Sequence, residues 1–441
     1  MWELLSSGVL SVWLETSGLD QMGRNAAAVL AWEGGLSGLV AAVGDADRSL
    51  GTDGVTMTAV NGYLRQLSVK GLIEGSQGVW MQSGIMPLAS NEGTVPIPGA
   101  SLTKIATSLA ALQTWGASYQ FETRVSVVGG INNGVLEGDL VVEGGGDPLF
   151  VWEEAIAIGN ALNQMGIFRV TGNLVIVGKF WMNYESNPLV AGDLLRSALS
   201  YTSWPGGVDV LYYKMPPGTK RPTVAIAGNV VAKKSLPVGR LLLKRRSLPL
   251  VEILKQMNIY SDNDLAQMLA DAMGGAKVVQ QQAAWAAGVP QSEVQLINGS
   301  GLGEENRISP RAICAMLQNI QRYLQPSKLT IADLFPVSGR DKGTLEHRHI
   351  PKGVVAKTGT LNRVIALAGV MPTREHGLVW FTIVNRGTDW DALRNEQDLF
   401  LQKLVKKWGV APRLPLAIMP HINGDRPALG AANRNEILIG G

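Results

Sequence analysis

The chain has 441 residues, of which 46% are hydrophobic and 17% charged, so it can bury one large core or two moderate ones and is not a disordered polyelectrolyte. Its 39 basic and 36 acidic residues give a formal net charge of +3, which is too small to indicate a nucleic-acid partner. The 52 glycines and 21 prolines predict many turns and a substantial β content.

The N-terminal part, residues 1–75, is a Gly/Ala-rich segment of undefined role that ends in a predicted helix from about Val55 to Leu67. Its apolar stretch Leu4–Leu14 follows an acidic residue, and the stretch Ala26–Gly44 is interrupted by Glu33. A secretory signal begins with positive charge, and a membrane span needs about 20 uninterrupted apolar residues. We therefore expect no clear signal peptide and no transmembrane helix.

The rest of the chain divides into four segments that differ in their predicted secondary structure. Residues 76–121 combine a strand pair with a helix from about Ser101 to Trp115. Residues 122–235 contain short β-like runs separated by glycine-rich turns, which predict a separate inserted β-rich domain. Residues 236–410 return to helices and close with two strands and a long helix. Residues 411–441, rich in Pro, Gly and Asn, predict a poorly ordered tail.

The first motif with chemical content is an S-x-x-K formed by Ser101 and Lys104 at the start of a predicted helix. Residues three apart share a helix face, so the amine can reach the hydroxyl. A serine hydroxyl needs a base to take its proton, and a lysine can act as that base where burial or positive charge lowers its pKa. An S-x-x-K occurs by chance in a chain this long, so the motif alone does not define a site.

Two further motifs follow. Ser261-Asp262-Asn263 is an S-x-N, in which the serine can relay a proton and the asparagine can hold a substrate carbonyl; the alternative is a helix N-cap.

Lys357-Thr358-Gly359-Thr360 is a K-T-G before a strand-like run. Its lysine and hydroxyls suit a carboxylate, and its glycine lets a substrate backbone approach; the alternative is an ordinary turn.

The combination of the motifs is more specific than its parts. Each pattern occurs once in the chain, in the order S-x-x-K, S-x-N, K-T-G. This ordered trio is typical of penicillin-binding proteins and class A β-lactamases. No G-x-S-x-G occurs, which disfavours a histidine-based serine hydrolase.

With these motifs the chain resembles the D-alanyl-D-alanine carboxypeptidase/endopeptidase family of low-molecular-mass (class C) penicillin-binding proteins, which carry an insertion between S-x-x-K and S-x-N. The similarity extends to Gly144–Pro148, Asn298–Leu302 and Gly343–Leu345, and covers residues 76–408. It implies an α/β (α+β) fold: a β-lactamase/transpeptidase-like domain with an antiparallel sheet flanked by helices, an all-helical subdomain, and an inserted β-rich domain. The catalytic domain would then comprise residues 76–121 and 236–410.

The resemblance also implies roles for the motif residues. Ser101 would attack the penultimate D-Ala carbonyl of a peptidoglycan stem peptide, with Lys104 as base and Ser261 as the proton relay. Asn263 would hold the peptide. The residues expected to bind the terminal carboxylate are Lys357, Thr358, Gly359 and Thr360.

Further expectations follow from the same resemblance. Asp147 would bind the amine of the stem-peptide diamino acid, although a turn role for G-G-G-D-P is the favoured alternative. β-Lactams would be covalent inhibitors, no metal or organic cofactor is implied, and the substrate places the enzyme in the periplasm or another extracytoplasmic compartment. The alternatives are a β-lactamase-like hydrolase, for which no E-x-x-x-N element is found, and a catalytically silent wall-binding scaffold.

Overall fold

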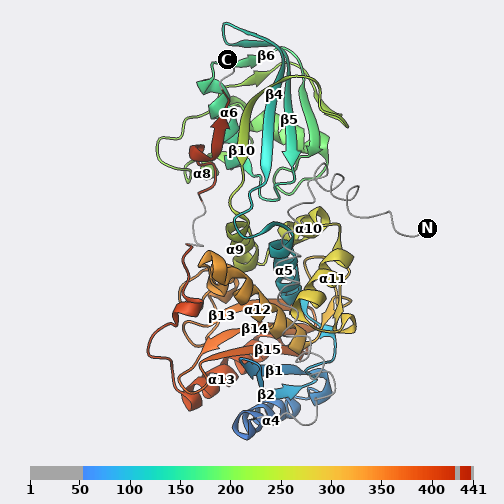
Figure 1. Ribbon diagram of the computed structural model, residues 1–441, viewed down its shortest axis with the longest axis vertical. Helices are drawn as coiled ribbons and strands as arrows, with labels where there is room; N and C mark the ends of the chain where they lie inside the picture. The colour runs from blue at the N-terminus through green and yellow to red at the C-terminus, as the bar shows by residue number, and fades with distance from the viewer. Residues whose placement is uncertain (1–52, 423–427, 439–441) are drawn as a thin grey trace, which may run out of the picture. The chain divides into compact units, whose positions relative to one another are not determined.

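The computed structural model describes residues 53–422 and 428–438 (Figure 1). The expectations about a signal peptide and about the apolar stretches before residue 45 lie outside the described residues. Within the described ranges, no helix combines the length and apolar character that crossing a membrane requires.

The larger core is built on a five-stranded antiparallel sheet in the order β13-β14-β15-β1-β2. Every residue of β14 is buried, because helices cover both faces of this sheet. Alternate side chains serve different faces: Ala366 and Ala368 join one cluster of buried residues, and Ile365 and Leu367 join the other. The strands are β1 (Gly78–Ser83), β2 (Met86–Asn91), β13 (Val355–Leu361), β14 (Val364–Pro372) and β15 (Leu378–Arg386).

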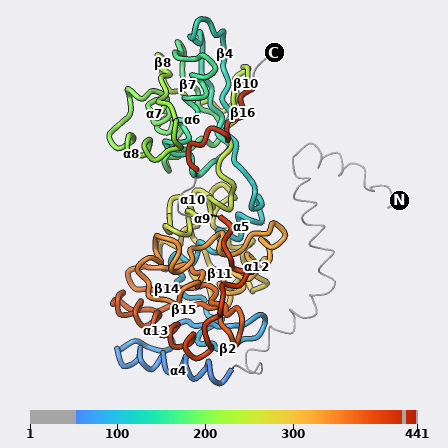
Figure 2. Tube along the Cα trace, turned by 90° about the vertical axis from the view of Figure 1, so that its left-hand side faces the viewer, coloured from blue at the N-terminus to red at the C-terminus, as the bar shows by residue number. Residues whose placement is uncertain are grey.

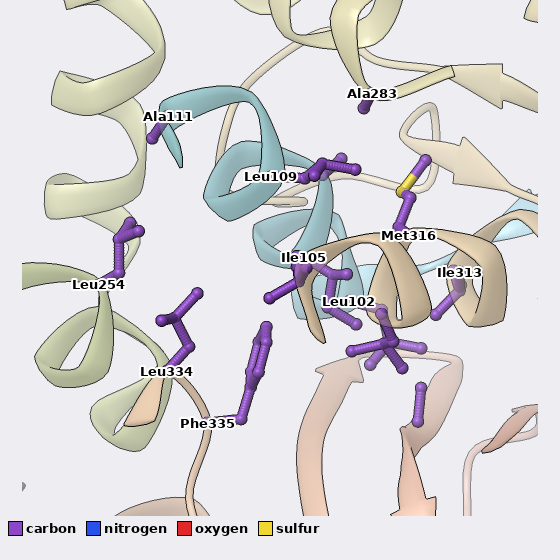
Figure 3. Packing of buried hydrophobic residues seen from close by; sticks show 14 of the residues in the cluster. Leu102, Ile105, Leu109, Ala111, Leu254, Ala283, Ile313, Met316, Leu334 and Phe335 are labelled. Carbon is purple, nitrogen blue, oxygen red and sulfur yellow. The ribbon is translucent and has the colours of Figure 1, made fainter. Parts of the chain in front are cut away.

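One face of the sheet carries a helical layer around α5 (Thr103–Trp115), in which residues 103–112 are all buried. A helix that is buried on every side lies inside a core rather than on a surface. Figure 3 shows Ile105 and Leu109 of this helix among apolar side chains from its neighbours. The predicted helix at this position is confirmed. The surrounding helices are α9 (Leu250–Tyr260), α10 (Asn263–Ala272), α11 (Ala276–Ala287) and α12 (Pro310–Leu324).

The other face of the sheet is covered by α13 (Trp390–Trp408) and by α4 (Gly54–Val69), which confirms the helix predicted before residue 75. The ring of Tyr63 stacks on Phe400 with 4.6 Å between centroids, and its hydroxyl donates to Asn385 at 2.8 Å. The expected domain boundary at residue 75 is therefore wrong for this helix. Its apolar face completes the same core as the sheet, a long-range contact that local composition does not reveal.

The β-rich unit between the first two motifs is a mixed sheet with helices packed on it. Its longest strands form a hairpin through Asn133-Gly134, both at positive φ, which is the turn chemistry that this pair favours. The sheet continues through β10, so its chain extends past the expected end at residue 235. The elements are β4 (Glu122–Asn132), β5 (Val135–Gly145), α6 (Trp152–Gln164), β6 (Arg169–Val170), β7 (Leu174–Lys179), α7 (Pro188–Ala198), α8 (Val208–Tyr212), β8 (Ala225–Ile226), β9 (Val230–Lys233) and β10 (Arg240–Arg246).

The C-terminal segment returns to this β-rich unit. Strand β16 (Asn435–Ile437) pairs antiparallel with β10, and the two lie side by side in Figures 1 and 2. Glu154, buried on α6, forms ion pairs of 2.6 Å with Arg245 of β10 and with Arg434. The expectation of a poorly ordered tail is wrong for residues 428–438, because buried charges and a strand pairing hold them.

A small third sheet links the helical layer to the loops around the site. Its order is β11-β12-β3, and Arg307 of β12 pairs with Pro98, which lies three residues before Ser101. Its strands are β3 (Ile97–Pro98), β11 (Val294–Gln295) and β12 (Arg307–Ile308).

Candidate active site

Ser101 lies in a short 3-10 turn, Ala100–Leu102, that leads directly into α5. The preceding Ala100 has a φ of +48°, a conformation that costs a non-glycine residue about 1–3 kcal/mol and is concentrated at functional sites. Gly301 and Gly359 lie against Ala100: a side chain on Gly301 would overlap its carbonyl oxygen, and one on Gly359 would crowd its methyl group. The serine is thus presented by a strained turn held between two glycines.

The amine of Lys104 is fully buried beside this serine. Its Nζ lies 3.1 Å from Ser101 Oγ, and it donates to Asn263 Oδ1 and to the Ser300 carbonyl oxygen, each at 2.7 Å. Burial lowers the pKa of Lys104 to about 7, although the negative charge of Asp262 acts in the opposite direction. A neutral amine has two N–H donors and one lone pair. When the amine is protonated it donates to Ser101 as well; when it is neutral and both donors are engaged by the two oxygens, its lone pair is left for Ser101.

The S-x-N motif occupies the junction of two helices. Helix α9 ends at Ser261, whose φ is +58°, and α10 begins at Asn263. Asp262 between them is the N-cap, because its carboxylate accepts from the backbone N–H of Leu265 at 2.9 Å. Capping therefore accounts for the middle residue only. The side chains of Ser261 and Asn263 are left to contact the two motif lysines.

The K-T-G motif lies on β13, at the edge of the sheet that borders Ala100. Lys357 is fully buried, and its Nζ donates to Ser261 Oγ at 2.8 Å and to the Thr358 carbonyl at 2.9 Å. Burial, together with the positive charge of Lys104, holds the pKa of Lys357 well below its usual value. Thr360 is exposed, and its hydroxyl accepts from Arg394 at 3.3 Å.

The loop Asn298–Leu302 places the carbonyl that contacts Lys104. Asn298 Oδ1 accepts from the Ser300 backbone N–H at 3.2 Å and from Gly301 N–H at 2.8 Å, which closes the loop on itself. Thr107 of α5 fixes the loop from the other side by donating to the Gly299 carbonyl at 2.7 Å. The asparagine thus makes the acceptor contacts that a carboxylate in its place would make.

Asp147 is placed differently from the other candidates. It is buried, and its carboxylate accepts from the Leu149 backbone N–H at 3.0 Å, which is the turn geometry expected for G-G-G-D-P. Burial and the nearby Glu154 charge raise the pKa of Asp147 to about 7. In the part of the chain that the structure describes, no hydrogen bond or ion pair joins it to the three motifs. Its role in binding the stem-peptide amine stays a prediction.

Several residues near the site had no signal in the sequence. Arg394 belongs to an ordinary stretch, and the Ser300 carbonyl lies in the segment Asn298–Leu302, whose similarity to the family did not indicate a contact with Lys104; both roles appear only once distant segments meet. Tyr184, also unforeseen, lies with Asn183 in a turn where both residues have positive φ. Together with Asp262 it lines a cavity of about 260 Å³, where burial, the Asp262 charge and a side-chain hydrogen bond to Asp262 raise the pKa of Tyr184. Amino-acid composition does not reveal that two consecutive non-glycine residues adopt positive φ.

The chain is similar to known proteins over most of its length. The model of the D-Ala-D-Ala carboxypeptidase 3 (S13) family matches residues 78–188 and 220–406. A D-alanyl-D-alanine carboxypeptidase of Haemophilus influenzae is 25% identical over 386 residues, which covers 64% of this chain and 79% of the relative. A carboxypeptidase of Mycobacterium tuberculosis is 27% identical over 366 residues, covering 70% of this chain and 75% of the relative.

Solved structures share the fold. The penicillin G-acylated predatory endopeptidase of Bdellovibrio bacteriovorus gives a TM-score of 0.69 at 21% identity, covering 80% of this chain and 96% of that chain. Penicillin-binding protein 4 of Haemophilus influenzae gives 0.59 at 21% identity, covering 78% and 98%. The predicted fold class, a β-lactamase/transpeptidase-like domain with an insertion, is confirmed.

Proposed function

Because the chain belongs to the D-Ala-D-Ala carboxypeptidase 3 (S13) family and is a serine-type carboxypeptidase, we propose that Ser101 is the nucleophile with which it removes the terminal D-Ala of peptidoglycan stem peptides. The observation that carries this assignment is the buried Lys104 amine, 3.1 Å from Ser101 Oγ with its two donors held elsewhere. A lysine with a pKa near 7 is matched to general-base work at neutral pH.

In the acylation step, the Ser101 proton moves to the Lys104 lone pair as Oγ bonds to the penultimate D-Ala carbonyl carbon. The oxyanion that forms is held by the backbone N–H groups of Ser101 and Thr360. Such preorganised donors are worth about 2.7–4 kcal/mol each in related acyl-transfer sites. Asn263 accepts from Lys104 through its Oδ1, so its amide NH₂ is the part that can donate to a peptide carbonyl.

The C–N bond breaks when the leaving amine receives a proton. That proton passes from Lys104 through Ser261, whose hydroxyl is already held by Lys357. Water then attacks the acyl-enzyme, giving a proton to Lys104, and the Ser101 alkoxide is released as its hydroxyl. The products are the shortened peptide and free D-Ala, whose amine carries away the original Ser101 proton, while the proton that Lys104 takes from water passes to the released Ser101 oxygen.

The terminal carboxylate of the substrate would bind between Lys357, Thr358 and Thr360, with Gly359 permitting its close approach. Burial and the positive charge of Lys104 disfavour the charged form of Lys357. A substrate carboxylate supplies the missing negative charge and raises the pKa of Lys357 again. The same contacts would hold the carboxylate of a β-lactam, which makes these drugs the proposed covalent inhibitors. The substrate class assigns the enzyme to the extracytoplasmic cell wall.

The test is intact-mass spectrometry after mixing with penicillin G, followed by peptide mapping, beside release of D-Ala from a D-Ala-D-Ala peptide. One penicilloyl group on the peptide that contains Ser101 is expected, and Ser101→Ala should show neither adduct nor D-Ala release. Thr114→Ala, a hydroxyl deletion at a half-buried position of the same helix, where the hydroxyl donates to the Ala110 carbonyl at 2.9 Å, is the matched control and should keep both. An adduct at another residue refutes the assignment. Rapid loss of the adduct with release of penicilloic acid would favour a β-lactamase instead.

A further inference from the structure

A cavity of about 530 Å³ lies at the edge of the five-stranded sheet where β13 begins, and none of the three motifs lines it. Its floor is apolar and buried, and comes from four segments: the residue before β13, the end of β14, the last turns of α13, and Val337, which forms an isolated β-bridge with Val355. The buried apolar lining residues are Val337, Val354, Met371, Pro372 and Val405.

The mouth of the cavity is cationic. Arg340, Lys352 and Arg413 line it and are exposed, and the lining residues include no aspartate or glutamate. Arg340 lies 3.9 Å from Asp341, but that buried carboxylate is already paired with Lys255 at 2.7 Å. Among the described residues, Lys352 and Arg413 have neither an ion pair nor a hydrogen-bonded side-chain partner. Three positive charges thus surround one apolar hollow, and two of them, Lys352 and Arg413, have no counter-charge within the described residues.

We propose that this cavity binds a single-chain amphiphile with a carboxylate or phosphate head. The apolar chain would cover the floor around Val354 and Met371, and the head would lie among the three cations. Neither half of such a ligand alone matches the site, because a free anion leaves the floor exposed to water and a neutral hydrocarbon leaves the cations unpaired. The volume lies within the range of about 300–1,000 Å³ of small-molecule sites.

The cavity belongs to the rigid part of the domain. Ser338 donates its backbone N–H to the Val354 carbonyl at 2.8 Å, and Gly353 donates to the Ser338 carbonyl at 3.1 Å, so the wall is tied to the start of β13. Because its residues are separate from Ser101 and Lys104, circular dichroism and thermal unfolding can report that a cavity variant is folded whether or not penicillin acylates the protein. The proposal therefore stands or falls independently of the proposed function.

The test is a titration of the full chain with dansyl-undecanoic acid, followed by displacement. Dodecanoate and dodecyl phosphate should displace the probe, whereas dodecyltrimethylammonium and inorganic phosphate should not. Lys352→Gln with Arg413→Gln should weaken probe binding by about ten-fold or more, as expected for loss of charge-assisted contacts. The matched control, Lys277→Gln with Arg322→Gln, removes one exposed lysine and one exposed arginine elsewhere and should bind like the unaltered chain.

A second arm separates a free amphiphile from a lipid bilayer. Co-sedimentation with phosphatidylglycerol vesicles should be no stronger for the unaltered chain than for the cavity double variant if the ligand is a free single chain. Vesicle binding that depends on Lys352 and Arg413 would overturn that part of the proposal in favour of a lipid headgroup. Absence of saturable probe binding, or equal binding by the two double variants, would overturn it entirely; far-UV circular dichroism and thermal unfolding check that all proteins are folded.

Discussion

The amine of Lys104 sits in an environment that decides its protonation state. It is buried, its two donors are satisfied by Asn263 and Ser300, and the carboxylate that influences it, Asp262, is engaged as a helix cap. Breaking any of these arrangements changes which protonation state the site favours. At the scale of single residues, the chemistry therefore depends on the two oxygens that accept from Lys104, and also on Asp262, whose carboxylate caps a helix.

The rate of acylation by penicillin G should depend on pH through Lys104. The amine acts as a base only when it is neutral, and its pKa is about 7. The rate should therefore fall about ten-fold for each pH unit below 7, as the neutral fraction falls, and level off above it. Stopped-flow acylation between pH 5 and 9 measures this profile.

The Lys104→Arg variant provides the counterpart, because arginine stays protonated in proteins and cannot act as a base. It should lose about 10²–10⁴-fold in rate. The exposed Lys403→Arg is the control and should keep both the rate and the profile. A flat profile in the unaltered enzyme would assign the base to another group.

Lys357 should distinguish a free carboxylate from an amide. Charge-assisted hydrogen bonds contribute about 1.5–3 kcal/mol each, or one to two orders of magnitude in rate. Lys357→Ala should therefore damage hydrolysis of an acid-terminated D-Ala-D-Ala peptide far more than that of its C-terminal amide. Steady-state kinetics on the matched pair measure the difference. Equal losses on the two would mean that Lys357 acts on Ser261, which it contacts at 2.8 Å, and not on the substrate.

Among the elements, the loop Asn298–Leu302 has the most specific task, since its folding aims the Ser300 carbonyl at Lys104. It is held by bonds accepted at a single atom, Asn298 Oδ1, from the backbone of Ser300 and Gly301 and from the Ser300 hydroxyl. The loop therefore depends on the acceptor, not on the amide as such.

Asn298→Ala removes three accepted bonds of about 0.5–1.5 kcal/mol each, so unfolding free energy should fall by about 1.5–4.5 kcal/mol, and the acylation rate should fall with it. Asn298→Asp keeps the acceptor and should preserve most of both. Urea denaturation and penicillin acylation measure the two quantities. If the aspartate variant is as damaged as the alanine variant, the bond from Asn298 Nδ2 to the Leu302 carbonyl is the one that matters.

Elements with local signals were predictable from the sequence. The helix after Ser101 shows apolar periodicity, and the Asn133-Gly134 turn has the residues that positive φ requires. The order of the three motifs predicted the family, and the structure brings their side chains into contact. Contacts between distant segments were not predictable: the packing of α4 on the sheet, the Ser300 carbonyl, and the Arg394 contact to Thr360 depend on tertiary pairing that no local pattern encodes.

On the scale of the whole molecule, the chain leaves the catalytic core before β4, builds the β-rich unit, returns through β10 to α9, and much later comes back with β16. Glu154 holds the C-terminal segment to the β-rich unit: it is 2% exposed and forms ion pairs with both Arg245 and Arg434. Arg245 is equally buried, so its charge depends on this carboxylate.

Glu154→Gln should lower the unfolding free energy by about 3–5 kcal/mol, because it leaves buried guanidinium groups without a counter-charge. Glu436→Gln is the matched control: it breaks the exposed pair with Arg246 in the same sheet and should cost less than about 1 kcal/mol. Thermal and urea denaturation compare the two. Similar small losses in both variants would show that the buried cluster is relaxed by water or by reprotonation.

The return of β16 also has a consequence in time. Arg434 is 280 positions beyond Glu154, so a ribosome working at about 5–20 residues per second makes it roughly 14–56 seconds later. Arg245 of β10 follows Glu154 by 91 positions. From its synthesis until that of Arg434, the edge of β10 that will receive β16 has no partner, and Glu154 has only one of its two arginines. The β-rich unit begins to form early in synthesis and is sealed only after the whole catalytic core has been made.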